Sequence, residues 1–285
     1  MVLRLGSDRA SAPPVVTVLR PSHHWPALNL RELWEYHELL YFLIWRQLKV
    51  RYKQTILGAS WAIIQPFLAM VIFSVFFGRL AGMPSEGVPY PIFAYAALVP
   101  WTYFANALTL ASSSLVEHER MLTKVYFPRL MLPMAAVLAG LLDLAIAFLV
   151  LLGLAVHYRI ALSLSLCVTP LFALLAAGIA VGVGLWLSAL NVQYRDVRHI
   201  TPFLVQIWLF ATPVAYPSSL VPEKWRVLYA LNPMAGVVEG FRWALVGKGQ
   251  PPGMFLFASI SMVVVILTSG LYYFRRTEAT FADVV

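Results

Sequence analysis

The sequence predicts an all-α integral membrane protein with six transmembrane helices and several shorter helices between them. Hydrophobic residues make up 60% of the chain and charged residues only 12%, and the mean hydropathy is +0.76. An average soluble domain carries about 25% charged residues. A helix needs roughly 20 mostly apolar residues to cross a bilayer. Six runs meet this requirement, centred on 60–80, 91–113, 131–156, 163–190, 200–217 and 254–274.

These runs fill most of the chain, so we expect one membrane domain over residues 29–276 and no separate soluble catalytic domain. A polar, proline-dotted tail (1–28) precedes this domain, and a short cytoplasmic tail (277–285) follows it. The first tail lacks the apolar segment of a secretory signal and is expected to be flexible and uncleaved. Cys167 is the single cysteine, which excludes an intrachain disulfide and a cysteine-based metal cluster.

Lysine and arginine are distributed unevenly between the two sides of the membrane. Alternate connections, counted with the tails, carry 15 of these residues on one side and 6 on the other. Basic residues favour the cytoplasmic side, so both termini are predicted to lie in the cytoplasm. The net charge of +8 gathers beside apolar runs, which favours anionic lipid headgroups over nucleic acid as the partner.

Residues 29–53 predict an amphipathic helix ahead of the first span. Asn29 can cap this helix together with Glu32, and apolar residues follow at helical spacing. The apolar run 39–45 is too short to cross and basic residues crowd its end, so the helix is expected to lie along the cytoplasmic membrane surface. It is either a plain anchor or also a wall of a cytoplasmic gate. The candidates for substrate contact at this entrance are Arg46, Arg51, Tyr52 and Lys53.

Two further cytoplasmic segments are candidates for contact with a soluble partner. Residues 117–129 favour a short amphipathic helix ended by Pro128, which is either a docking element or a solvated turn. The compact charged loop 191–197 separates two apolar runs, as a cytoplasmic hinge would. The contact candidates in these segments are Glu117, Glu119, Arg120, Lys124, Tyr126, Tyr194, Arg195 and Asp196.

The external connection 217–252 is neither polar enough for a free loop nor apolar enough to span. Pro222 can start one short helix, the Asn232-Pro233 pair interrupts the chain, and 234–246 can form a second helix. Two half-length helices dipping into the outer leaflet fit this pattern, because interrupted backbone at that depth must be buried in protein or line a watery cavity. The gate candidates are Trp225, Asn232, Pro233 and Glu239.

No motif for nucleotide, metal or hydrolytic chemistry is present. Gly247-Lys248 lacks the rest of a phosphate-binding loop, so any ATP must be used by a partner. The histidines never fall at metal-ligand spacing with carboxylates, and no catalytic residue is predicted. Asp143 is the one acid inside a predicted span, where burial is costly. For Asp143, a structural or channel-facing role is favoured over proton coupling. An ion pair across a subunit interface is one way to stabilise its carboxylate.

Two kinds of side chain within the apolar runs bear on helix packing and on the transport path. Gly178 and Gly182 lie one helical turn apart and predict close helix packing. Most of the numerous aromatic residues are expected to form interface belts and helix contacts. The alternative is a pathway on which the apolar faces of sugar rings slide. The aromatic candidates for lining it are Phe67, Phe73, Trp101, Tyr103, Trp208 and Tyr216.

The order of these elements resembles the membrane subunit of ABC exporters for polysaccharides, the O-antigen, capsule and teichoic-acid permeases. The resemblance extends from about residue 30 to residue 276. It is carried by five correctly spaced segments: KVRYKQTILGASWAIIQP (49–66), LTKVYFP (122–128), NVQYRD (191–196), ATPVAY (211–216) and LNP (231–233).

The resemblance implies a homodimer with a channel along its axis, joined to two ATPase subunits that bind ATP and Mg²⁺, with no cofactor in this chain. Residues 117–127 would be the coupling helix, with the loop around Tyr194 near the same contact, and 222–246 the periplasmic gate. The cargo would be a polysaccharide on polyprenyl pyrophosphate or a related lipid, exported across a bacterial inner membrane. From charge and position, we expect Arg46, Arg51 and Lys53 to contact the cargo phosphates.

Other classes of membrane protein remain as alternatives. An exporter of the same build for a drug or a plain lipid differs only in its cargo. An ATP-independent lipid-glycan flippase is usually about twice this length with internal repeats. A membrane glycosyltransferase or phosphotransferase needs clustered acids at a cytoplasmic face. Only Glu117, Glu119 and Asp196 are available, without a recognisable catalytic pattern.

Overall fold

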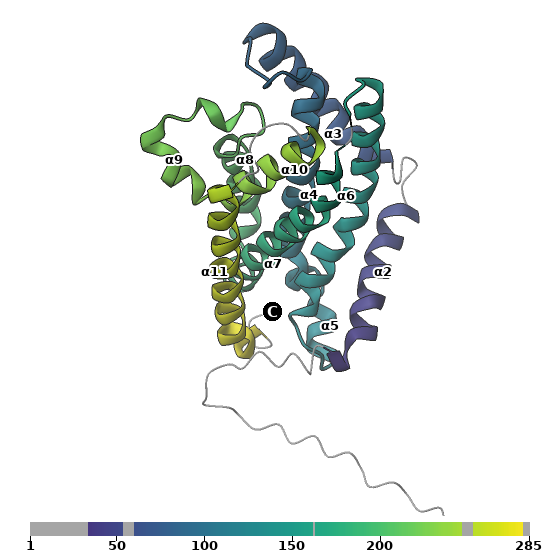
Figure 1. Cartoon of the computed structure of the whole chain (residues 1–285). Coiled ribbons are helices and arrows are strands. Elements are labelled where there is room, and N and C mark those ends of the chain that lie inside the picture. Colours follow the sequence, from purple (N-terminus) through teal and green to yellow (C-terminus); the bar gives the residue numbers. More distant parts are fainter. Residues whose placement is uncertain (1–33, 54–59, 162, 247–252, 282–285) are drawn as a thin grey trace, which may run out of the picture.

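The computed structural model describes residues 34–53, 60–161, 163–246 and 253–281. Within these residues the chain is helical without any strand, as predicted. The long helices form one bundle, with short helices at both ends (Figure 1). The predicted tail 1–28, the cap by Asn29 and Glu32, and residues 282–285 lie outside the described residues.

The helices are α2 (His37–Lys53), α3 (Ser60–Phe73) with the π-helical η1 (Ser74–Leu80), α4 (Tyr90–Glu117), α5 (Glu119–Lys124), α6 (Met131–His157), η2 (Leu164–Val168), α7 (Thr169–Gln193), α8 (Val197–Ala211), η3 (Ser218–Leu220), α9 (Glu223–Ala230), α10 (Pro233–Val246), α11 (Gly253–Thr277) and η4 (Glu278–Thr280).

The helix α4 lies at the centre of the bundle. It packs most extensively against α6 and α7, and α3 and α10 also contact it. Its core-facing positions alternate small residues, such as Ala97 and Ala111, with large ones, such as Tyr95 and Phe104, all of them fully buried. Small residues let neighbouring helices approach closely, which is how helices pack within a membrane.

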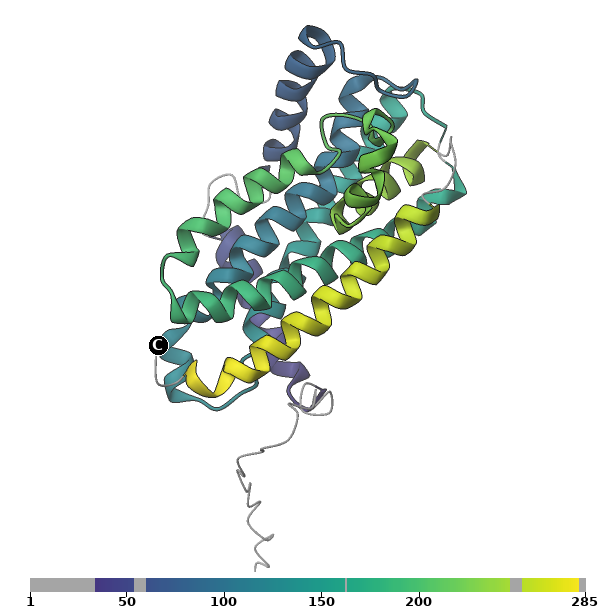
Figure 2. The ribbon, with the colours of Figure 1, turned by 90° about the vertical axis from the view of Figure 1, so that its left-hand side faces the viewer.

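The helices α7 and α11 approach each other closely enough for backbone contact, and they run side by side in Figure 2. A Cβ atom on Gly270 would lie 2.3 Å from the carbonyl oxygen of Gly182, so a side chain there would clash with backbone. A Cβ atom on Gly178 would lie 3.0 Å from the side chain of Val263. The prediction that Gly178 and Gly182 mark a close helix contact is therefore confirmed.

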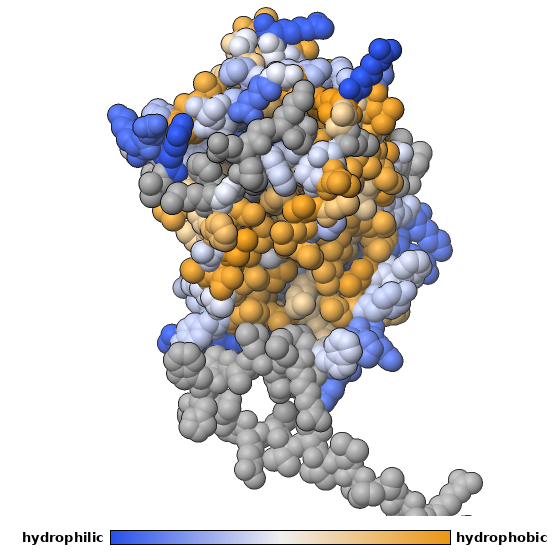
Figure 3. Space-filling model, in the orientation of Figure 1, coloured by the Kyte–Doolittle hydropathy of each residue, from blue (hydrophilic) through white to orange (hydrophobic). Residues whose placement is uncertain are grey.

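Four segments of the described residues are long and apolar enough to cross a membrane: Ser60–Leu80, Met131–His157, Leu164–Gln193 and Leu256–Thr280. They correspond to the first, third, fourth and sixth predicted runs. The helix α4 covers the second run over 28 residues but carries more polar side chains. In the space-filling view, apolar residues form a band across the middle of the visible face, with polar residues above and below it (Figure 3).

The fifth predicted run, 200–217, is wrong at its C-terminal end, because α8 stops at Ala211. Thr212 precedes Pro213 and is extended (φ −105°, ψ 144°), the conformation that a following proline favours. At 15 residues, α8 is about 22 Å long, which is shorter than the apolar core of a bilayer.

The helix α2 runs lengthwise beside α6 instead of lying across the end of the bundle, as a surface helix would (Figure 1). Leu43 is buried in an apolar cluster that also contains Met131 and Ala135 of α6. The last turn of α2 reaches the middle of α6, where Arg51 and Tyr52 bind the carboxylate of Asp143. Contacts with α6 along the whole length of α2 thus set its direction.

The segment after α11 folds back onto the bundle, which the sequence did not predict for a tail. Phe281 is fully buried, with its ring 5.3 Å from that of Phe274. The carboxylate of Glu278 binds Arg275 at 2.9 Å and accepts the backbone N–H of Arg129 at 3.3 Å. The C-terminal turn is therefore joined to the chain between α5 and α6.

The helices α9 and α10 form at the opposite end of the bundle from α5 (Figure 1). The prediction of two short helices broken at Asn232-Pro233 is confirmed, with Pro233 as the first residue of α10. Pro suits this position, because the N–H that it lacks would have no partner within the helix.

Candidate functional site

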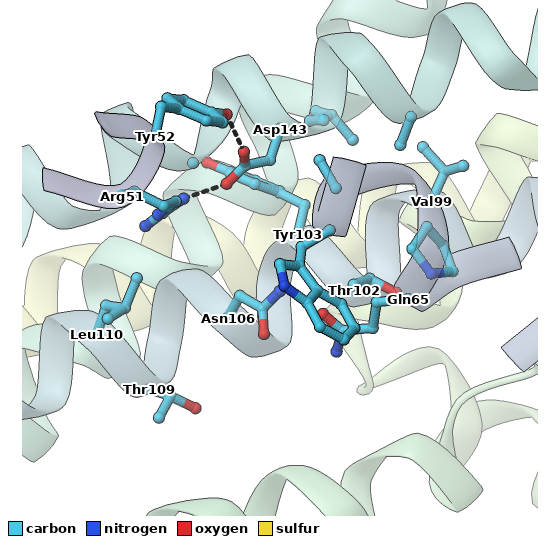
Figure 4. A pocket seen from close by; sticks show the side chains of 16 residues that line it. Arg51, Tyr52, Gln65, Val99, Thr102, Tyr103, Asn106, Thr109, Leu110 and Asp143 are labelled. Carbon is cyan, nitrogen blue, oxygen red and sulfur yellow. Dashed lines mark hydrogen bonds and ion pairs between the residues drawn. The ribbon is translucent and has the colours of Figure 1, made fainter. Parts of the chain in front are cut away.

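A polar pocket of about 360 Å³ lies between α2, α3, α4 and α6 (Figure 4). These helices are predominantly apolar, yet half of the side chains that line the pocket are polar or charged. They are Arg51, Tyr52, Gln65, Thr102, Tyr103, Asn106, Thr109 and Asp143. Of the described residues that line the pocket, Arg51 is the one cation and Asp143 the one anion.

The carboxylate of Asp143 is held by two consecutive residues of α2. The Arg51 guanidinium donates to Oδ2 and the Tyr52 hydroxyl donates to Oδ1 (Figure 4). The exposed fractions of the Arg51 and Asp143 side chains are 29% and 21%, so the pair lies at the pocket wall and is not sealed within the core. Asp143 therefore pairs inside the subunit, and the subunit-interface pairing considered from the sequence is not needed to neutralise it.

The opposite wall is formed by α3 and α4. Thr102, Asn106 and Thr109 follow one another at intervals of four and three residues, so they share one face of α4. The Thr109 hydroxyl donates to the Ala105 carbonyl at 2.8 Å. Among the side chains drawn in Figure 4, no hydrogen bond engages Gln65, Thr102 or Asn106. All three side chains line the pocket.

The other predicted entrance residues lie on a different side of α2. Arg46 and Lys53 border a separate, shallow groove of α2 with Phe42, Trp45 and Lys49. Arg46 and Lys53 are exposed. The structure thus brings Arg51 and Tyr52 together at the inner pocket and leaves Arg46 and Lys53 on the outer face.

The six predicted channel aromatics do not form one continuous surface within the subunit. Tyr103 lines the pocket and its hydroxyl donates to the Val137 carbonyl at 3.3 Å, whereas Trp101 is buried against Phe104. Phe67 is exposed on α3, and Phe73 packs on Phe77. Trp208 and Tyr216 lie toward the α10 end of the bundle. A channel lined by these residues stays a prediction.

The predicted partner-contact residues gather at the α5 end of the bundle. The helix α5 is anchored by the buried Leu122 and by Phe127 after it. The exposed side chains around these anchors are Glu117, Glu119, Arg120, Lys124 and Tyr126. The apolar side chain of Val125 is exposed beside them, as is the ring of Tyr126. Charged residues around a few exposed apolar side chains are the composition expected of a protein-binding surface.

The turn between α7 and α8 is held at the same end. The Asn191 side chain donates to the Ser112 carbonyl at 3.0 Å, so the end of α7 is tied to the end of α4, directly before α5. Tyr194, Arg195 and Asp196 are exposed in the turn that follows. The two segments predicted to contact a partner are therefore both fixed to the same helix.

The sequence matches the profile of one protein family, described as ABC-2 type transporter, over residues 38–246. This chain belongs to the ABC-2 type transporter family. It is 29% identical over 254 residues to the O-antigen export system permease protein RfbA of Myxococcus xanthus, covering 87% of this chain and 96% of that protein. A protein of the same description from Klebsiella pneumoniae is 27% identical over 253 residues, covering 87% of this chain and 95% of that protein. The polysialic acid transport protein KpsM of Escherichia coli is 23% identical over 244 residues, covering 83% and 92%.

At the α10 end of this ABC-2 chain, Arg242 forms a centre that the sequence analysis missed. Its side chain is 6% exposed and lies 3.6 Å from the ring centroid of Phe93. It donates to the carbonyl oxygens of Val214 (2.7 Å), Phe93 (3.3 Å) and Tyr216 (3.4 Å), and it pairs with Glu239 at 3.4 Å. An arginine three residues after a glutamate in an apolar helix is the signal that could have revealed the pair.

Two predicted gate residues of the ABC-2 chain have defined places in this region. Asn232 joins α8 to α10: its Oδ1 accepts from Trp208 Nε1 at 2.8 Å and from the Met234 N–H at 3.1 Å. Its Nδ2 donates to the Ala211 carbonyl at 3.0 Å. Trp225 is exposed on α9.

Proposed function

We propose that this chain is the permease subunit of an ABC exporter that moves a lipid-linked surface polysaccharide, an O-antigen or a related glycan, across a bacterial inner membrane. The observation that carries the proposal is the alignment with an O-antigen export permease over 87% of this chain and 96% of that protein. The polar pocket within an apolar bundle supports it, because a glycan with its phosphates needs hydroxyl, amide and cationic partners inside the membrane.

We propose six spans with both termini in the cytoplasm. The helix α4 supplies the second span and α8 most of the fifth, and α9 and α10 dip into the outer leaflet as a periplasmic gate. The location of α5, the α7–α8 turn and the C-terminal turn at one end of the bundle supports a common cytoplasmic side (Figure 2). The excess of basic residues on that side agrees with this orientation.

The working exporter is a homodimer with two ATPase subunits, which bind ATP and Mg²⁺. Apolar faces support this assembly: within the most hydropathic part of Ser60–Leu80 only 11% of residues are buried, and of α8 only Val197 and Thr201 are buried. A second subunit that covers part of these faces would enclose a path between the two copies. The chain itself carries no phosphate-binding loop, so the energy source is the partner.

Closure of the ATPase subunits on ATP moves α5, and the bundle reorients around the path. The exposed charges of Glu119 and Lys124 contact the ATPase, and the buried Leu122 passes the displacement to the bundle. Arg46, Arg51 and Lys53 of α2 meet the cargo phosphates at the entrance. The permease makes and breaks no covalent bond.

The experiment that tests this function is deletion of the gene in its host, followed by fractionation of the lipid-linked surface polysaccharide. Intracellular accumulation with loss from the surface is the expected result, and a plasmid copy of the gene restores the surface polymer. Inactivating the partner ATPase gene should reproduce the accumulation. Unchanged surface polymer in a host without a second exporter would reject the polysaccharide assignment in favour of a drug or lipid exporter.

A further inference from the structure

The pair formed by Arg51 and Asp143 lies at the wall of a polar pocket within the apolar bundle. Asp143 is near the middle of α6 (Met131–His157), far from both ends of the bundle. A charge at such a depth is costly unless it is paired. An arginine that binds a carboxylate with charge-assisted hydrogen bonds also binds phosphate, because both ligands offer planar or tetrahedral sets of acceptor oxygens.

The pocket wall facing this pair suits the remainder of a phosphorylated glycan lipid. Gln65, Thr102 and Asn106 present amide and hydroxyl groups that no side chain drawn in Figure 4 engages. Trp61 lines the same pocket and is 52% exposed, so it offers a flat apolar face. Hydroxyl and amide groups pair with sugar hydroxyls, and aromatic faces pack on the apolar faces of sugar rings.

Electrostatics forbids Asp143 and a cargo phosphate from holding Arg51 with equal strength at the same time. A phosphate that approaches Arg51 is repelled by the Asp143 carboxylate, and the repulsion is strong where the dielectric constant is low. Losing the Asp143 contact without gaining another anion would cost Arg51 a charge-assisted hydrogen bond at this depth. When the phosphate takes the place of the carboxylate, Arg51 keeps an anionic partner and Asp143 keeps the hydrogen bond from the Tyr52 hydroxyl.

We propose that Arg51 exchanges partners, binding Asp143 when the pocket is empty and a phosphate of the lipid-linked cargo when it is loaded. Asp143 is then an internal substitute for the cargo phosphate. The same exchange leaves the Tyr52 hydroxyl as the remaining partner of Asp143 in the last turn of α2, so we expect loading to loosen this turn. This inference rests on the proposed function, since it takes the cargo to be a phosphorylated lipid.

The test is binding of a polyprenyl pyrophosphate without glycan to the purified exporter, reconstituted with its ATPase subunits in lipid nanodiscs. Asp143→Asn removes the competing charge while keeping the shape of the side chain. We expect this variant to bind the pyrophosphate about tenfold more tightly, and Arg51→Gln to bind it at least tenfold more weakly. Lys49→Gln removes one positive charge from the outer face of the same helix and should bind as the natural protein does.

Unchanged or weaker binding by Asp143→Asn would overturn the exchange and leave Asp143 a structural partner of α2. A second measurement uses the natural sequence and does not depend on how the variants fold. Hydrogen–deuterium exchange in the last turn of α2 should accelerate when the pyrophosphate is added and not when polyprenol is added. No change at saturating pyrophosphate would also overturn the proposal.

The pyrophosphate-binding test and the gene-deletion test of the polysaccharide assignment can fail independently of each other. If the gene deletion leaves the surface glycan unchanged but Asp143→Asn tightens pyrophosphate binding, the exchange holds for a different phosphorylated lipid. If the deletion blocks glycan export but Asp143→Asn does not tighten binding, the function stands and the exchange is rejected.

Discussion

Two arginine–carboxylate pairs lie at different depths of this bundle and are held in opposite ways. Arg242 is 6% exposed, and its guanidinium reaches three backbone carbonyls and an aromatic ring in addition to Glu239. Arg51 is 29% exposed, and its partner Asp143 forms part of a pocket wall. Backbone carbonyls cannot be displaced without unfolding the segment that carries them, whereas a carboxylate beside a cavity can be replaced by another anion. The first pair therefore fixes structure, and the second is free to exchange.

The largest expected effect is on Arg242. Arg242→Met leaves Glu239 buried without its charge partner and leaves the Val214 and Tyr216 carbonyls without their donor. Losing one partner of a buried pair costs about 3–5 kcal/mol of stability. Thermal unfolding of the detergent-purified protein measures this loss. Arg226→Gln, which removes the exposed pair with Glu223, is the matched control and should cost less than about 1 kcal/mol. Equal stability of the two variants would contradict a fixed role for Arg242.

A smaller loss is expected at the acidic partner. In Glu239→Gln the amide oxygen can still accept from Arg242 and from the Ser218 N–H, so only the charge is lost. We expect this variant to be destabilised by about 1–3 kcal/mol, the range for one hydrogen bond to a charged group. The same unfolding assay measures it. A loss as large as that of Arg242→Met would show that the ion pair outweighs the carbonyl contacts.

At the exchangeable pair, stability should change less than binding. Asp143→Asn keeps one acceptor oxygen, which can accept from Arg51, while the new amide N–H can donate to the Tyr52 hydroxyl. Because the site is also partly exposed, we expect a loss of about 1 kcal/mol. Comparing its unfolding temperature with that of Glu239→Gln, in the same detergent, tests whether the two pairs differ in kind. A loss for Asp143→Asn that exceeds the loss for Glu239→Gln would reverse the comparison.

The smallest effect on stability is expected at α5, whose charges are fully on the surface. Glu119→Lys or Lys124→Glu should change the free energy of unfolding by no more than about 0.5 kcal/mol. Export of the surface polymer should nevertheless be lost if, as proposed, these charges contact the ATPase. Arg159→Glu, in the turn after α6, is the control for a reversed surface charge. Normal export together with normal ATP hydrolysis in both α5 variants would reject the docking assignment.

Local patterns in the sequence were sufficient for most of the helices. Apolar runs, the Asn232-Pro233 break and the Gly178–Gly182 spacing each have a local physical cause, and the structure confirms them. The end of α8 was missed although its signal is local, since Pro213 restricts the residue before it. The predicted run extended past Ala211 because it was drawn from apolar composition alone.

The partners of charged residues could not be read from the sequence. Arg51 and Asp143 are 92 residues apart, and their contact depends on α2 running along α6 instead of across its end. Four residues of the entrance were chosen by charge and position, and the structure separates them into an inner and an outer pair. Arg242 was overlooked because its carbonyl partners come from α4 and from the chain after α8.

The C-terminal turn has a mechanical consequence for the exporter. Glu278 binds the backbone of Arg129, and Phe281 is packed beneath it on α11, so the link that follows α5 is clamped to the last helix as well as to α6. The helix α11 is in turn in backbone contact with α7. If α5 is displaced by the ATPase as proposed, these contacts would transmit the displacement to α6, α7 and α11 together, and the bundle would move as a unit.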